Sequence, residues 1–245
     1  MAKTKTIICH YCDGLGFIDD SENGAPAGLR CSYCDGDGKV AKPAKVNPIP
    51  DHSVMVARLK EHFEYATVRD IHQGKHWYDD ARAIADTLAV GTGYSVEQTA
   101  SVIAVLSPNV AWDENVNAAI LAVEGHFYKI PWQSWRGAGY GENKAKASDI
   151  LDGDLTRLRG PKVTQFAKGI LGDREACTVD MWMLRAVGVE DTLTVTPRRW
   201  TAIYNAISEA ATECGYDTCT FQAIVWSKVR NETLAKNPKH AWRVA

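Results

Sequence analysis

Four cysteines near the start of the chain are spaced so that their thiolates can bind one metal ion. They are Cys9, Cys12, Cys31 and Cys34, and each pair lies in a repeat of the form C-x-Y-C-D-G-x-G. Two intervening residues let both sulfurs of a pair reach one tetrahedral ion, and the glycines permit the tight turn that points amides at sulfur. We therefore expect one structural Zn²⁺ ion. A redox-active pair is the alternative, and His10 is a possible replacement for one cysteine ligand.

A lysine at a turn and an aspartate at a helix start are the second group with chemical potential. Lys162 follows a tight turn that contains Arg159 and Gly160, and Asp180 precedes an apolar segment that contains Arg185. A glycine turn between helices can offer free backbone amides to a phosphate. If Lys162 and Asp180 face one cleft, they form a candidate catalytic pair. The plain alternatives are a helix cap for Asp180 and a solvated charge or phosphate contact for Lys162.

The chain has three segments of different composition, and these determine how the candidate residues are positioned. Residues 1–40 are rich in Gly, Asp and Cys, and we interpret them as a zinc-binding module. Residues 41–50 hold several prolines and are predicted to be a semi-rigid linker. Residues 51–245 carry apolar residues at helical spacing and are predicted to form a helical domain. The expected fold class is all-α.

The predicted helices have recognisable starts and ends. Ser95 and Gln98 form a capping-box pattern, Pro108 interrupts the helix that follows, and Thr196-Pro197 is a helix start with proline in the first position. The expected helices cover residues 51–65, 77–88, 95–106, 112–123, 143–151, 155–158, 162–171, 180–187, 197–213 and 221–230.

The composition narrows the range of partners and compartments. The chain has 245 residues, of which 45% are hydrophobic and 24% charged, with 28 basic and 30 acidic side chains. A net charge of −2 excludes a partner held only by a global positive field, so nucleic acid would need a local basic surface. No apolar run approaches the ~18 residues of a membrane span. Seven cysteines without a recognisable secretion signal favour the reducing cytoplasm.

The cysteine repeat resembles the C-x-x-C-x-G-x-G zinc motif of the DnaJ-type cysteine-rich domain. Two of that family's four repeats are present, which is enough for one zinc ion. The resemblance covers about thirty residues and does not imply a chaperone, because nothing similar to a J-domain is visible. Zinc knuckles of this kind serve as folding staples, protein contacts or nucleic-acid contacts.

The helical part resembles the helix-hairpin-helix DNA glycosylases, the superfamily that includes endonuclease III. Lys162 matches the hairpin lysine of the bifunctional members, Asp180 the essential aspartate, and Arg185 the arginine that follows it. Residues 105–109 with 115–118 look like the family's L-S-x-Q … V-N-x-A segment, and residues 139–145 look like its G-x-Y-x-x-K-A segment. The resemblance covers about Ser95 to Val189.

This resemblance implies a DNA glycosylase, possibly with lyase activity, that acts on a base flipped out of the duplex. Asp180 would stabilise the cationic sugar, and Lys162 would attack it to form an imine. Asn109 would fill the gap in the stack or read the opposite base. The implied DNA contacts are Asn109, Arg159, Gly160, Lys144 and Arg185, and the stacking candidates are Tyr140, Trp112 and Trp182.

Two other functions remain open. Some bacteriophage enzymes that hypermodify thymine in DNA resemble the same superfamily, and they install a group on a base instead of removing it. A non-catalytic, zinc-containing nucleic-acid-binding protein is the third reading, with Lys162 and Asp180 purely structural. The tryptophans would then be core residues.

Overall fold

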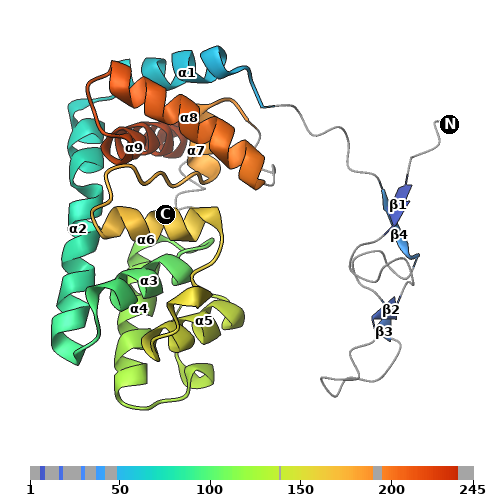
Figure 1. The fold of residues 1–245 in the computed structure, drawn as a ribbon, viewed down its shortest axis with the longest axis vertical. Coiled ribbons are helices and arrows are strands. Elements are labelled where there is room, and N and C mark those ends of the chain that lie inside the picture. Colours follow the sequence, from blue (N-terminus) through green and yellow to red (C-terminus); the bar gives the residue numbers. More distant parts are fainter. Residues whose placement is uncertain are drawn as a thin grey trace. The chain divides into compact units, whose positions relative to one another are not determined.

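The chain divides into two compact units, Met1–Pro48 and Ile49–Ala245, in the computed structural model (Figure 1). The structure describes residues 6–8, 17–18, 29–30, 37–41, 49–137, 139–189 and 195–236. The four cysteines predicted to bind zinc, and His10, lie outside the described residues.

Short antiparallel strands flank both cysteine repeats in the first unit. Strand β1 (Thr6–Ile8) pairs with β4 (Lys39–Ala41), and β2 (Phe17–Ile18) pairs with β3 (Leu29–Arg30). Strands β1 and β2 border the first repeat in sequence, and β3 and β4 border the second. The two pairings therefore place the residues that border one repeat beside those that border the other.

The second unit is helical, which confirms the predicted all-α class for its described residues. Its elements are α1 (His52–Glu64), α2 (Val68–Thr92), α3 (Val96–Leu106), α4 (Trp112–Phe127), the 3₁₀ turn η2 (Trp132–Ser134), α5 (Gly141–Leu151), the 3₁₀ turn η3 (Leu155–Arg157), α6 (Pro161–Ile170), α7 (Met181–Ala186), α8 (Pro197–Glu213) and α9 (Thr218–Lys236). Within the described part of the chain, no helix has the length and apolar character needed to cross a membrane.

Local capping signals set several of these helix ends. The predicted capping box is confirmed at α3, where the Ser95 side chain accepts from the Gln98 amide and the Gln98 side chain accepts from the Ser95 amide. Helix α2 begins and ends further out than predicted. A second capping box, Thr67 with Asp70, starts it, and Gly93 ends it in the left-handed conformation at φ 77°.

Two hydrophobic clusters form the interior of the helical unit. The first cluster gathers buried residues from α2 to α6, and the second gathers them from α1, α7 and α8. Helix α9 contributes to both, with Cys219 and Ala223 in the first and Phe221 and Val225 in the second. A helix buried on two opposite sides needs apolar residues around most of its circumference, and α9 has them. The long helix α2 runs alongside both groups (Figure 1).

Candidate active site between the two helical clusters

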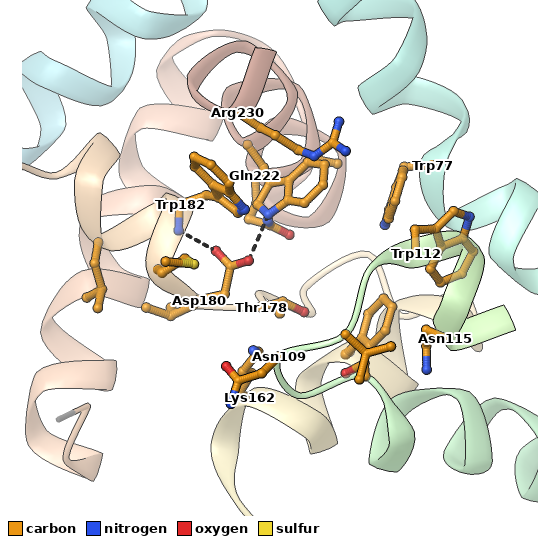
Figure 2. A pocket seen from close by; sticks show the side chains of 18 of the residues that line it. Trp77, Asn109, Trp112, Asn115, Lys162, Thr178, Asp180, Trp182, Gln222 and Arg230 are labelled. Carbon is orange, nitrogen blue, oxygen red and sulfur yellow. Dashed lines mark hydrogen bonds between the residues drawn. The ribbon is translucent and has the colours of Figure 1, made fainter. Parts of the chain in front are cut away.

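A pocket of about 520 Å³ opens at the boundary between the two clusters (Figure 2). Its walls come from α2, α4, α6, α7 and α9 and from the turn after α3. Five of the residues predicted from the sequence line it, although they are distributed over more than seventy positions of the chain. They are Asn109, Trp112, Lys162, Asp180 and Trp182.

Asp180 is the N-cap of α7, and three hydrogen bonds hold its carboxylate. Oδ1 accepts from the amides of Trp182 at 2.9 Å and Met183 at 3.1 Å. Oδ2 accepts from the indole Nε1 of Trp226, on α9, at 2.8 Å (Figure 2). The capping alternative is therefore correct for the local geometry. The indole bond is additional to capping, because it fixes the second oxygen from across the pocket.

The environment of Asp180 favours its protonated form more than water does. Burial raises the pKa of this carboxyl, because an ionised carboxylate loses hydration there. The positive charge of Lys162 and the hydrogen bonds from Trp226 and the two amides act in the opposite direction. Lys162 is therefore near enough to influence the carboxylate, as a shared cleft requires.

Lys162 lies where the pocket meets a second, smaller hollow of about 160 Å³. Arg159 and Gly160 line this hollow, next to the start of α6. Gly160 caps that helix at φ 97°, a backbone conformation that favours glycine, and Pro161 occupies the first helical position. Proline has no amide hydrogen, so the amides of the following residues are the first donors of the helix.

Three indole rings form a continuous aromatic wall. The ring centroids of Trp77 and Trp112 are 5.0 Å apart, and those of Trp77 and Trp226 are also 5.0 Å apart. Trp182 is placed differently, because only 3% of its surface is exposed and the Arg185 guanidinium lies 4.5 Å from its ring centroid. Of the two predicted stacking tryptophans, Trp112 thus belongs to the wall, whereas Trp182 is chiefly part of the second cluster.

Asn109 and Tyr140 meet beside the pocket. The Asn109 side-chain nitrogen donates to the Tyr140 hydroxyl at 3.3 Å, and Tyr140 is 59% exposed and outside the pocket lining. Asn109 has φ 59°, a left-handed conformation that asparagine tolerates better than most residues. An exposed aromatic ring next to the opening can contact a large ligand but not one enclosed in the pocket.

Lys144 does not line the pocket. Its ammonium donates to the main-chain oxygens of Trp135 at 2.9 Å and Gly137 at 3.1 Å. The lysine predicted to contact DNA therefore ties α5 to the loop that precedes it.

The pocket contains several polar and aromatic residues that the sequence reasoning missed. At its floor, the Tyr78 hydroxyl donates to Gln222 Oε1 at 3.0 Å and lies 3.1 Å from Thr178 Oγ1. The missed polar and aromatic residues are Trp77, Tyr78, Ser107, Asn115, Phe166, Thr178, Gln222, Trp226 and Arg230. One signal was available, because Gln222, Trp226 and Arg230 recur every four residues and so share a face of one helix.

In the described ranges, no group of three or more His, Cys, Asp or Glu side chains is arranged to hold a metal ion. The donor set of the pocket is one carboxylate, two cations, amides and hydroxyls. This set is suited to an organic ligand with hydrogen-bonding and anionic groups.

Comparison with known families assigns the chain to one of them. The model of the family of unknown function DUF7178 matches residues 42–233, and the chain belongs to that family. No curated protein and no solved structure matches the chain.

Proposed function

We propose that this DUF7178 member is a DNA glycosylase with lyase activity, which acts on a base in DNA through Asp180 and Lys162. The observation that carries the proposal is the meeting of a fixed carboxylate and a lysine in one aromatic pocket. A pocket of about 520 Å³ has the size of a small-molecule site and suffices for one nucleotide.

The proposed chemistry assigns separate roles to the two residues. When the bond between sugar carbon C1′ and the base breaks, the base leaves with the electron pair and the sugar becomes cationic. The Asp180 carboxylate stabilises that cation, and its three donors keep it in place without reorganisation. The Lys162 amine, after losing a proton to water, adds to C1′ as the base leaves. The nitrogen then loses a second proton, the C1′–O4′ bond breaks with protonation of O4′, and the opened sugar is held as an imine.

The aromatic wall and the hollow beside Lys162 support a DNA substrate. The wall of Trp77, Trp112 and Trp226 can hold a base that has left the stack, because offset aromatic rings attract each other. Arg159 and the start of α6 can contact the phosphates on either side, as cations and helix N-termini commonly do.

Mass spectrometry of duplex DNA digested after incubation with the full chain tests the proposal. Release of a free base supports a glycosylase. A base of increased mass would instead establish a base-modifying enzyme. DNA that stays bound but chemically unchanged would establish a binding protein.

We predict that borohydride traps a covalent adduct between the chain and duplex DNA with abasic sites, and that Lys162→Ala abolishes it. Borohydride reduces the imine that Lys162 forms to a stable amine. Gel electrophoresis with labelled DNA measures the adduct. Lys168→Ala is the matched control, because Lys168 is an exposed lysine of the same helix and does not line the pocket. An adduct of undiminished yield in Lys162→Ala would remove Lys162 as the nucleophile.

We further propose that the first unit binds one structural Zn²⁺ ion through Cys9, Cys12, Cys31 and Cys34. The strand register supports this, because Ile8 pairs with Lys39 and Phe17 with Arg30. These four residues directly border the two cysteine repeats. Paired strands at both ends are the support that a four-sulfur site needs, since each repeat supplies two of the ligands.

We predict one zinc ion per chain by elemental analysis, and loss of most of it in Cys31→Ser. A structural zinc site typically contributes about 10–16 kcal/mol of binding free energy, which three ligands do not retain. Cys214→Ser is the control, since Cys214 lies in the helical unit. Full zinc occupancy in Cys31→Ser would contradict the proposed ligand set. A metal-free chain with a disulfide would support the redox alternative.

A further inference from the structure

One face of α9 presents a ladder of hydrogen-bond donors to the pocket. Gln222, Trp226 and Arg230 are spaced by one turn and all line it. Figure 2 labels the first and the last of the three. At 1.5 Å per residue, the two ends of this ladder are about 12 Å apart along the helix axis. The Trp226 indole nitrogen is occupied by Asp180, so Gln222 and Arg230 are the two ends available to a ligand.

Gln222 is the inner end of the ladder. Only 3% of its surface is exposed, and its Oε1 accepts the hydrogen bond from the Tyr78 hydroxyl. Its side-chain nitrogen has no partner among the residues that the structure describes. Among the described residues, this nitrogen is not one of the fully buried polar atoms that lack a partner, so it is accessible from the pocket, where a ligand that brings an acceptor can accept its hydrogen bond.

Arg230 is the outer end. Its guanidinium lies 5.5 Å from the Trp226 ring centroid, and none of the ion pairs in the described part of the chain includes it. Burial lowers the pKa of Arg230, and Asp113 acts in the opposite direction through its charge. A partly dehydrated guanidinium of this kind favours an anionic oxygen, above all that of a phosphate.

The space between the two ends suits a planar ring. The wall formed by Trp77, Trp112 and Trp226 borders it, and ring stacking tolerates many heteroaromatic rings. An acceptor at one end, a ring in the middle and an anion at the other end are the parts of a nucleotide.

We infer that the pocket binds one nucleotide, whose base directs a carbonyl oxygen to Gln222 and whose phosphate pairs with Arg230. A carbonyl oxygen projects beyond the ring edge and meets the amide donor directly. Adenine instead projects an amino group, which would place donor against donor. The inference rests on the proposed function and adds the class of base and the phosphate contact.

Quenching of tryptophan fluorescence on titration with dTMP, thymidine, dAMP and inorganic phosphate tests this inference. We expect dTMP to bind more tightly than thymidine and dAMP. Arg230→Gln should weaken dTMP about tenfold or more, because a charge-assisted bond is lost, and should leave thymidine unchanged. Lys228→Gln, which alters a cation of α9 outside the pocket lining, is the control. Unchanged dTMP affinity in Arg230→Gln, or equal affinity for dTMP and dAMP, would overturn the inference.

Gln222→Leu should weaken dTMP and thymidine alike, by about fivefold to tenfold. Gln222→Glu keeps an acceptor for Tyr78 and replaces the leucine variant in this test if that variant unfolds.

An oligonucleotide with one thymine that displaces dTMP supports a nucleotide within DNA as the ligand, whereas no displacement overturns DNA as the source of that nucleotide. Selective dTMP binding without any change to DNA would leave this inference standing and reject the proposed reaction. Release of a base from DNA without selective dTMP binding would reject this inference and leave the proposed reaction standing.

Discussion

Asp180→Asn is expected to reduce the release of a base from DNA by about 100-fold or more, the usual range for a catalytic carboxylate. Asparagine keeps an oxygen that can accept from the amides of Trp182 and Met183, so α7 retains its cap. It cannot stabilise a cationic sugar, because it has no charge. Rates of base release from duplex DNA, measured for both proteins at saturating concentration, test this.

Asp217→Asn is the matched control. Asp217 also accepts a hydrogen bond at a helix start, from the amide of Thr220 at 2.8 Å, but it does not line the pocket. Its change should affect stability and leave base release intact. An Asp180→Asn variant as active as the native chain would reduce Asp180 to a helix cap and reject the proposed mechanism.

The same carboxyl predicts a pH dependence with a definite sign. Burial raises the pKa of Asp180 in the folded chain, so the folded state binds this proton more tightly than the unfolded state. The associated stability is present below the ordinary aspartate pKa of about 3.9 and is lost as pH rises through the folded pKa. From pH 4 upward, the free energy of unfolding of Asp180→Asn should therefore rise relative to that of the native chain. Urea unfolding at several pH values measures this difference.

Gly74→Ala is expected to destabilise the helical unit by about 3 kcal/mol or more, at the upper end of overpacking effects. Gly74 lies in α2, and a Cβ atom there would be 2.4 Å from Ile224 Cα and 2.5 Å from Ile224 N. Both contacts are with the backbone of α9, which cannot rotate away as a side chain can. The two helices must separate, and they carry Trp77 and Trp226 of the aromatic wall.

Gly91→Ala provides the control within the same helix. No atom lies within 4 Å of the position that its Cβ would occupy, so alanine should stabilise α2 by about 0.5–1 kcal/mol. Thermal unfolding followed by circular dichroism compares the two variants. Equal melting temperatures for Gly74→Ala and the native chain would show that α2 and α9 leave room for a Cβ atom at position 74.

Helix-capping signals, which act within a few residues, could be identified from the sequence. Ser95 and Gln98 cap α3 as predicted, and Thr196 caps α8 with Pro197 in its first position. These patterns work because a side chain satisfies backbone groups that lie next to it in the chain. Helix positions and the all-α class followed from such signals, together with apolar residues at helical spacing.

Tertiary packing decided which residues line the pocket. Lys162, Asp180 and Trp112 were chosen from the sequence, yet their meeting in one pocket depends on how α4, α6 and α7 pack. Trp77 was predicted only as the first residue of a helix over residues 77–88, and it lies well inside α2. Lys144 stays a predicted DNA contact, and only the fold shows that its ammonium donates to main-chain oxygens of a neighbouring loop.

Gly74 shows why local sequence signals predict helices but not the contacts between them. Nothing near it in sequence indicates that its missing side chain matters, because the atoms that a Cβ would meet belong to Ile224, far along the chain. The sequence by itself determined which segments are helical and where α3 and α8 begin, since capping and periodicity are short-range. Only the tertiary structure decided which helix faces approach closely enough to form a site, because that depends on the packing of distant surfaces.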